Sequence, residues 1–317
     1  MAKIVRVEML MVDLKPKVKR TDAIQSFVSQ ETPIVRIFDA DGGIGTGYSY
    51  TIGTGGPAIL SLIERTLAPA IIGREAAEIE RIWRDLLFLT HATSVGAITS
   101  LALAAIDTAL WDLKCRRHGE PLHRMAGGAQ ERIPLYTTEG GWLHIETSAL
   151  VEDALAAKAS GFGGAKIKIG RPHVSEDVAR LEAVRSAVGP AFEIMTDANQ
   201  RFTIDEAIRR ARCLTPIDIA WLEEPLTADD LSGHIRLSQS TTIPIGIGES
   251  YTALCISVST CSKVPAQSFK SMWRALAASR PGSRSRIWLS ASTCRFARIF
   301  SWSCMWRCVQ PYQTPAG

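Results

Sequence analysis

The feature that most restricts the fold of this chain is a regular alternation of apolar and amphipathic segments between residues 133 and 250. Apolar segments of strand length are each followed by a stretch with helical periodicity. The predicted strands are residues 133–137, 164–168, 193–197, 219–223 and 244–248. The predicted helices between them are residues 147–159, 174–188, 204–213 and 228–239. Repeated strand–helix units of this length predict a parallel sheet, and a closed (β/α)8 barrel is a common form of it.

The residues before this repeat have a pattern typical of a separate α+β unit. Strands are predicted over residues 3–14 and 33–51, with Asp41-Gly42-Gly43 as a hairpin turn, and helices over 56–71, 75–89 and 94–117. The GGIGTG string at 42–47 is similar to a dinucleotide-binding fingerprint. Its glycine spacing is not G-x-G-x-x-G and no helix follows directly, which argues against a cofactor role.

We therefore predict three segments. An α+β domain covers residues 1–128, the first five strands of a barrel cover 129–250, and an aberrant tail covers 251–317. Hydrophobic residues make up 46% of the 317 and charged residues 21%, which excludes disorder, collagen and coiled coil. The sequence has no apolar run long enough to span a membrane and no signal-peptide pattern at its start, so we expect a cytoplasmic protein.

The charge distribution sets the last 67 residues apart. All 32 Asp and Glu precede residue 251, whereas nine of the 36 Lys and Arg follow residue 250. Residues 1–250 thus carry 27 basic and 32 acidic side chains, a net charge of −5, and the tail carries +9. A basic nucleic-acid-binding arm is one interpretation. The five Cys and four Trp of the tail argue against it, because solvated basic arms are rich in neither.

Three carboxylates end or directly follow successive predicted strands. Asp197, Glu223 and Glu249 are separated by 26 residues in each case, which is one strand–helix unit. In a parallel barrel such positions converge on the C-terminal mouth, where active sites lie. Converging carboxylates repel one another unless a cation lies among them, and oxygen ligands favour Mg²⁺. A helix cap or a salt bridge is the alternative for any one of them, but three in register favour a metal site.

Two lysines lie on an earlier strand. Lys166 and Lys168 form the K-x-K of AKIKIG, so their side chains share one face of the strand, here the barrel interior. Burial beside another ammonium disfavours the charged form and lowers a lysine pKa, which makes the lysine a usable general base. A solvated strand face is the alternative, but the strand is otherwise apolar. We predict catalytic roles for both lysines.

Taken together, K-x-K, TDANQ, WLEEP and GES, in this order, resemble the enolase superfamily and specifically the mandelate racemase group. The resemblance covers residues 1 to about 250 and implies an α+β capping domain followed by a (β/α)8-type TIM barrel. It implies abstraction of the proton alpha to a carboxylate, with Mg²⁺ stabilising the enediolate. Asp197, Glu223 and Glu249 match the metal ligands, Lys168 matches the base, and Lys166 matches the neighbour that lowers the pKa of the base.

The resemblance extends to further positions. Asn199 and Glu224 match second-shell or substrate-contact positions, although a capping or surface role is an equal alternative. Residues 15–30 and about 50–55 match the capping loops that close over substrate. The first of these loops opens with four cations, which would suit an acidic substrate or form a solvated basic loop.

The tail departs from the family pattern. A second base, a His paired with an Asp, and a Glu on the last strand are expected after Glu249, yet no His, Asp or Glu occurs there. The sequence therefore predicts a barrel that is incomplete after its fifth strand, with no residue to assign as the second base. We interpret the tail as a frameshift between GES and about residue 267. Rereading Ser268–Ala291 and Thr293–Pro315 in the alternative frame can supply a strand with an Asp, a Pro-His strand and a Glu.

The function predicted from the sequence is Mg²⁺-dependent proton abstraction from a sugar acid or hydroxy-acid, most simply by an acid-sugar dehydratase of the hydro-lyase class. A 2-hydroxy-acid racemase and a catalytically inactive remnant are the alternatives. The expected partner is a small-molecule carboxylate, with neither nucleic acid nor membrane. A homo-oligomer is expected if the barrel is complete.

Overall fold

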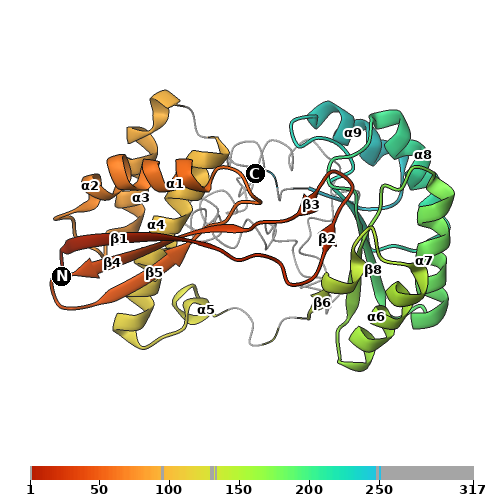
Figure 1. Cartoon of the computed structure of the whole chain (residues 1–317), viewed down its shortest axis with the longest axis horizontal. Coiled ribbons are helices and arrows are strands. Elements are labelled where there is room, and N and C mark those ends of the chain that lie inside the picture. Colours follow the sequence, from red (N-terminus) through yellow and green to blue (C-terminus); the bar gives the residue numbers. More distant parts are fainter. Residues whose placement is uncertain (1, 94–95, 129–131, 133, 248–249, 251–317) are drawn as a thin grey trace, which may run out of the picture.

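Figure 1 shows the computed structural model of the chain, which describes residues 2–93, 96–128, 132, 134–247 and 250. Two predictions lie outside the described residues. These are the role of Glu249 as a metal ligand and the interpretation of residues 251–317 as an aberrant, frameshifted tail that leaves the barrel incomplete. In the described part of the chain, no helix is both long enough and apolar enough to cross a membrane.

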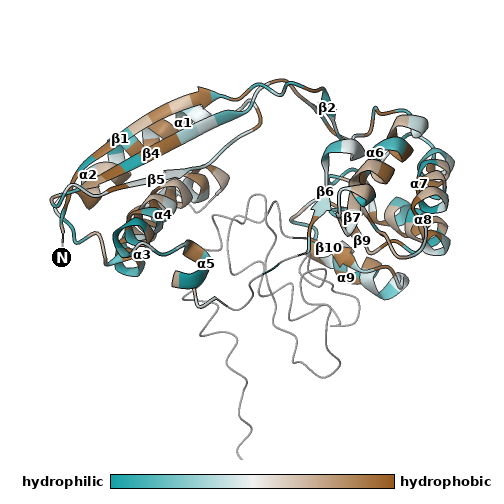
Figure 2. Cartoon of the chain, turned by 90° about the horizontal axis from the view of Figure 1, so that it is seen from below, coloured by the Kyte–Doolittle hydropathy of each residue, from teal (hydrophilic) through white to brown (hydrophobic). Residues whose placement is uncertain are grey.

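The first unit is a three-stranded antiparallel sheet with helices on one face (Figure 2). The sheet order is β1 (Ile4–Asp13), β4 (Glu31–Asp39) and β5 (Ile44–Tyr48), with the predicted hairpin turn between the last two. The helical segments are α1 (Gly56–Leu62), the π-helical turn Ile63–Leu67, α2 (Ala68–Ile71), α3 (Ile79–Leu89), α4 (Ala97–His118) and α5 (Leu122–Met125). Isoleucines and leucines of the sheet and these helices form one buried core.

The GGIGTG string has a packing role in this unit. Gly45 and Gly47 lie on the face of β5 that contacts α4. A Cβ atom at Gly45 would lie 2.0 Å from the carbonyl oxygen of Ala109, and one at Gly47 would lie 2.1 Å from that of Ala105. The two glycines therefore let the helix backbone rest directly on the strand, which explains a glycine-rich string without a nucleotide.

We predict that Gly47→Ala destabilises the first unit. A methyl group has no room between two backbones, and overpacking of this kind typically costs about 1–3 kcal/mol or more. The free energy of unfolding from urea denaturation measures the effect. Gly163→Ala is the matched control, because a Cβ at that glycine would meet no atom closer than 3.6 Å. An equal loss of stability in the two variants would contradict the packing role.

A buried carboxyl group lies in α4. Asp107 is 4% exposed, and no hydrogen bond among the described residues reaches its Oδ2. Burial, together with the charge of Glu80, raises the pKa of Asp107 well above its ordinary value. When the pKa of an acid is higher in the folded than in the unfolded state, the free energy of unfolding of the protein falls as the pH rises from the unfolded to the folded pKa.

Asp107→Asn should therefore stabilise the chain increasingly as the pH rises above about 4. Because one pH unit between folded and unfolded pKa corresponds to about 1.4 kcal/mol, we expect at least that gain in unfolding free energy at pH 8. Denaturation at pH 5 and pH 8 tests this, with the exposed Asp205→Asn as control. A gain that is the same at both pH values would refute the ionisation argument.

The second unit is a parallel sheet of the order β10-β9-β8-β7-β6. Its strands are β6 (Tyr136–Thr137), β7 (Gly164–Lys168), β8 (Glu193–Asp197), β9 (Trp221–Glu223) and β10 (Ile245–Gly246). The helices between them are α6 (Thr147–Ala159), α7 (Val174–Val188), α8 (Ile204–Leu214) and α9 (Leu231–Ser240), which lie on the outside of the sheet (Figure 1). This is the strand order of a (β/α) barrel, and with the first unit it confirms the predicted fold class.

Capping side chains and apolar burial explain where these elements begin. Helix α8 starts after Thr203 and α9 after Asp230, whose side chains accept hydrogen bonds from the backbone N–H groups of Glu206 and Gly233. Apolar side chains between the sheet and its helices form a second core, including Ile167, Ile194 and Leu222, which are fully buried. Backbone pairing between neighbouring strands fixes the register of their C-terminal ends.

Candidate active site

The register of the parallel sheet brings three predicted residues to the same level. Lys168 pairs with Asp197 across β7 and β8, and Asp197 pairs with Glu223 across β8 and β9. Each is the last residue of its strand, so all three lie at the C-terminal edge of the sheet. The structure thus brings together side chains that are 29 and 26 residues apart in the sequence.

Lys166 lies between two buried carboxylates. Its Nζ is 2.9 Å from Oε1 of Glu223 and 3.1 Å from Oδ2 of Asp197. Asp197 is fully buried, Glu223 is 1% exposed and Lys166 is 9% exposed. The other oxygen of Glu223 accepts a hydrogen bond from the indole N–H of Trp221 at 3.0 Å. The ammonium therefore neutralises two carboxylates that adjacent strands force close together.

Lys168 contacts the same carboxylate oxygen of Asp197 as Lys166 does. Its Nζ donates to Oδ2 of Asp197 at 2.7 Å and to Oδ1 of Asn199 at 2.8 Å. The ammonium also lies 5.6 Å from the ring centroid of Trp142, within the range of a cation–π contact. Asn199 is thus a direct neighbour of the predicted base.

The two lysines control the ionisation of Asp197. Burial alone would raise the pKa of this carboxyl group, but the charges and hydrogen bonds of Lys166 and Lys168 outweigh burial and lower the pKa below its ordinary value. Asp197 is therefore an anion throughout the neutral pH range. An ionised, buried carboxylate at a strand end is suited to bind a cation.

The backbone after these strands is strained. Asn199, Gln200 and Glu224 have φ angles of 44°, 63° and 39°, a region that non-glycine residues seldom adopt. Hydrogen bonds hold the conformation: the Gln200 N–H donates to the carbonyl oxygen of Glu224 at 2.6 Å, and the Glu224 N–H donates to that of Gly246 at 2.8 Å. Strain of this kind clusters at functional sites.

Glu224, the other predicted second-shell residue, has a different environment from Asn199. It is 4% exposed, and its Oε1 accepts a hydrogen bond from the backbone N–H of Ser250 at 3.0 Å. The side chain of Gln200 donates to Oγ of Ser250 at 2.9 Å. Glu224 thus ties the end of β9 to the chain that follows β10.

The donor set fits a hard divalent cation in part. Asp197 and Glu223 offer buried carboxylate oxygens, which are the ligands that Mg²⁺ prefers. Within the described residues no group of three His, Cys, Asp or Glu is placed to hold a metal ion. The third predicted ligand, Glu249, falls outside those residues.

A hairpin from the first unit docks beside this site. Strands β2 (Arg20–Thr21) and β3 (Ser26–Phe27) pair with each other in the segment predicted as a capping loop. The Phe27 ring packs edge-on against Trp142, with centroids 5.4 Å apart. Arg20 donates to Oε1 of Glu139 at 2.8 Å, and the backbone N–H of Leu143 donates to the carbonyl oxygen of Thr21 at 2.9 Å. Figure 1 shows the hairpin beside β6.

Trp142 is a site residue that the sequence analysis missed. It lies at the end of the 3₁₀ turn Glu139–Gly141 that follows β6, it is 8% exposed, and it contacts both the hairpin and Lys168. Its position in the sequence could have indicated it: it follows the C-terminal end of a barrel strand, the end at which Lys168, Asp197 and Glu223 also lie.

Comparison with known proteins identifies the family. Residues 6–127 match the family model "Mandelate racemase / muconate lactonizing enzyme, N-terminal domain". Residues 149–255 match the model "Enolase C-terminal domain-like". The chain belongs to the mandelate racemase/muconate lactonizing enzyme family. The resemblance inferred from the sequence motifs, and with it the enolase superfamily, is therefore confirmed.

Relatives and solved structures of this family are similar over most of the chain. The 3,6-anhydro-alpha-L-galactonate cycloisomerase of Streptomyces coelicolor is 39% identical over 221 residues, which cover 69% of this chain and 61% of that protein. The L-talarate/galactarate dehydratase of Salmonella typhimurium is 35% identical, over 69% of this chain and 55% of that protein. The chain thus spans about three fifths of the length of these curated relatives.

Several solved structures of the family contain magnesium. A racemase from Streptomyces coelicolor A3(2) with bound magnesium has a TM-score of 0.79 and 35% identity, covering 82% of this chain and 73% of that chain. The Salmonella dehydratase liganded with Mg and L-lyxarohydroxamate also has a TM-score of 0.79, with 30% identity over 83% of this chain and 68% of that chain.

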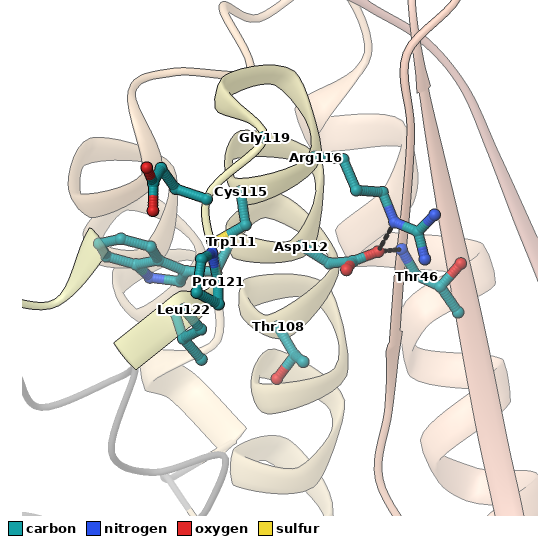
Figure 3. Close-up of a pocket in the computed structure, with 10 residues that line it drawn as sticks. Thr46, Thr108, Trp111, Asp112, Cys115, Arg116, Gly119, Pro121 and Leu122 are labelled. Atoms are coloured by element: carbon teal, nitrogen blue, oxygen red, sulfur yellow. Dashed lines mark hydrogen bonds and ion pairs between the residues drawn. The ribbon is translucent and has the colours of Figure 1, made fainter. Parts of the chain in front are cut away.

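A cavity of about 420 Å³ lies in the first unit of this family member (Figure 3). Residues of α4 and the segment that follows it line most of the cavity, among them Trp111, Asp112 and Arg116. Asp112 accepts hydrogen bonds from Arg116 and from the backbone N–H of Thr46. None of the lining residues belongs to the C-terminal edge of the sheet, so this cavity is separate from the lysine–carboxylate site.

We predict that Lys166→Met reverses the pH dependence of stability in the presence of EDTA. In the wild type the lowered pKa of Asp197 adds stability that is complete above its unfolded pKa of 3.8 and is lost as the pH falls. The variant leaves buried carboxylates short of an ammonium, so burial raises their pKa and stability falls as the pH rises. We expect a loss of about 3 kcal/mol at pH 8, where the carboxylates are ionised.

Denaturation at pH 5 and pH 8 measures this. Lys158→Met is the control, because that lysine donates to the carbonyl oxygen of Val188 on the helical side and contacts no carboxylate of the site. Equal stability of the Lys166 variant at both pH values would show that Lys166 does not compensate the two carboxylates.

Proposed function

We propose that this protein removes the proton alpha to the carboxylate of an acid sugar in a Mg²⁺-dependent reaction, as an acid-sugar dehydratase. The observation that supports the proposal most strongly is the cluster at the strand ends. It joins two lysines and two carboxylates through three contacts of 2.7 to 3.1 Å. Among the relatives are dehydratases of talarate, galactarate and arabinonate, which supports a sugar acid as the substrate class.

Asp197 and Glu223 would hold the ion, together with Glu249 as the third ligand that the family resemblance implies. The lowered pKa of Asp197 supports this role, because an ionised carboxylate needs no deprotonation before binding. When bound, the ion would stabilise the negative charge that develops on the substrate carboxylate as its alpha proton leaves. The magnesium in two similar structures is consistent with this assignment.

Lys168 is the proposed base. As a free amine, its Nζ accepts the alpha proton and becomes an ammonium, and Oδ2 of Asp197 and Oδ1 of Asn199 are placed to accept hydrogen bonds from that ammonium. Lys166 keeps a second positive charge beside the same carboxylate oxygen. Departure of the β-hydroxyl as water, with a proton from a second acid, completes the dehydration. Return of a proton to the opposite face would instead give a racemase.

Deuterium exchange tests the proposal. Incubation of the protein with Mg²⁺ and a panel of sugar acids in D2O should replace the alpha proton of one of them, visible by ¹H NMR. Loss of water in the same sample identifies a dehydratase, whereas exchange with inversion at the alpha carbon and no loss of water identifies a racemase. Lys168→Ala should slow the exchange by at least about 100-fold, since general acid–base catalysis contributes about 10²–10⁴-fold.

Lys158→Ala is the control for that experiment, because it removes a hydrogen-bonded lysine that lies outside the site. Unchanged exchange in Lys168→Ala would refute its role as base. Absence of exchange with every acid in the wild type would refute the activity of this chain and favour an inactive remnant.

Magnesium binding gives a readout that is independent of turnover. Mg²⁺ should raise the thermal midpoint of the wild type and EDTA should reverse the rise, because a ligand that binds only the folded state stabilises it. Asp197→Asn should abolish the effect, whereas the exposed Asp205→Asn should keep it. A rise of the same size in Asp197→Asn would exclude Asp197 as a ligand.

A further inference from the structure

A buried arginine on α7 contacts the backbone on both sides of the proposed base. Nη1 of Arg180 donates to the carbonyl oxygen of Lys168 at 3.1 Å. Nη2 of the same guanidinium donates to the carbonyl oxygen of Trp142 at 3.2 Å and reaches that of Ile145 at 3.5 Å. One side chain thus joins the end of β7 to the loop that follows β6.

The carbonyl group of Lys168 needs such a partner because β7 pairs with β8 at this level but has no neighbour on its β6 side. Strand β6 pairs with β7 only at Tyr136 and Thr137, which lie opposite Gly164 and Ala165. Where β7 reaches Lys168, β6 has already ended. Arg180 supplies the hydrogen-bond donor that a longer β6 would otherwise provide. It thereby fixes the backbone of Lys168.

The second contact fixes what the Lys168 ammonium faces. Trp142 presents its ring to Nζ of Lys168 at 5.6 Å, and its backbone carbonyl is bound by Arg180. The loop has little freedom next to β7, because a Cβ at Gly141 would lie 2.0 Å from the carbonyl oxygen of Lys166. Arg180 and Gly141 therefore hold the indole at a set height above the lysine.

The burial of Arg180 is costly, which indicates a specific role. It is 2% exposed, and burial, followed by the charge of Arg171, lowers its pKa to about 10. It therefore remains a cation at neutral pH. In the described part of the chain it forms no ion pair, whereas the buried Arg210 pairs with Asp177 and Glu206. Its hydrogen bonds go to carbonyl groups beside the site.

We infer that Arg180 is a positioning residue for the reaction: it holds the backbone of Lys168 and the indole of Trp142 in one geometry, so that the amine of Lys168 meets the substrate in a fixed place. This inference rests on the proposed function, in which Lys168 is the base. Arg180 acts through Lys168 and Trp142 and does not itself exchange a proton with the substrate.

The same helix provides a matched control. Arg185 also donates to backbone carbonyl groups, those of Gly189, Phe192, Ile217 and Asp218. These acceptors lie outside the cluster of Lys166, Lys168, Asp197 and Glu223. Arg185→Lys therefore removes an arginine that also bridges several carbonyl groups, without touching the site.

The kinetic test compares Arg180→Lys with Arg185→Lys in the full chain. A lysine keeps the charge but cannot bridge the carbonyl groups of Lys168 and Trp142 together. We expect Arg180→Lys to lower kcat for alpha-proton exchange by about 10–100-fold with KM changed by less than about threefold, because a small misplacement of a reacting group costs up to about 100-fold. Arg185→Lys should keep kcat within about twofold of the wild type, even if it lowers the thermal midpoint as much as Arg180→Lys does. Equal kcat in the two variants would overturn the inference.

An NMR measurement tests the geometry without turnover. The protein is labelled with ¹³C at the lysine Cε, and the Lys168 signal is the one that is absent in Lys168→Arg. The difference in its chemical shift between the wild type and Trp142→Leu gives the ring-current shift caused by Trp142. Arg180→Lys should move this signal toward its Trp142→Leu position, and Arg185→Lys should leave it in place. A signal unmoved in Arg180→Lys would overturn the inference.

The two arms separate the two proposals. A wild type without exchange activity would refute the proposed function, and the NMR shift would still decide whether Arg180 sets the geometry of Lys168. An active wild type with unchanged kcat and unchanged shift in Arg180→Lys would refute the positioning role alone.

Discussion

The ion pairs of Lys166 are the interaction on which the site depends. Adjacent strands β8 and β9 end in carboxylates at the same register, and both carboxylates are withdrawn from water. Two buried anions on neighbouring strand ends would repel each other strongly. Removal of a buried counter-charge typically costs several kcal/mol. Lys166 compensates the charge of both carboxylates. Lys168 donates hydrogen bonds to Asp197 and to Asn199. The ion pairs of the two lysines thus keep ionised carboxylates at this edge of the sheet, where they can bind a cation.

Rigid backbone contacts then give this charged cluster a fixed shape. Residues with positive φ follow both carboxylate strands, and hydrogen bonds between successive loops hold them. A glycine allows the loop after β6 to touch β7, as Gly45 and Gly47 allow α4 to touch β5 in the first unit. In both units the chain places glycine where two backbones meet, and the side chains around that contact gain precision because neither backbone can shift.

The sequence was sufficient to predict the scaffold and the residues at its strand ends. Strands β7 and β8 have the predicted bounds because apolar segments bounded by glycine and polar residues leave few alternatives, and the spacing of Asp197 and Glu223 follows from the length of the repeat. The two-residue strands of the hairpin escaped prediction because so short a pairing has no periodicity. Arg180 escaped because its partners are carbonyl groups, which every residue has. Lys166 was predicted only as the neighbour that lowers the pKa of Lys168. Its contact with Glu223, 57 positions away, is visible only in the structure.

The docking of the β2–β3 hairpin onto the second unit has a consequence for how such a protein can change. Phe27 and Arg20 belong to the chain segment of the first unit, yet their partners Trp142 and Glu139 belong to the turn after β6. The wall beside Lys168 is therefore encoded in two distant stretches of the gene. A recombination event that exchanged one stretch for that of a relative would separate interlocking halves. A hairpin of different shape or charge would therefore need a matching turn after β6, although the two segments are more than a hundred residues apart.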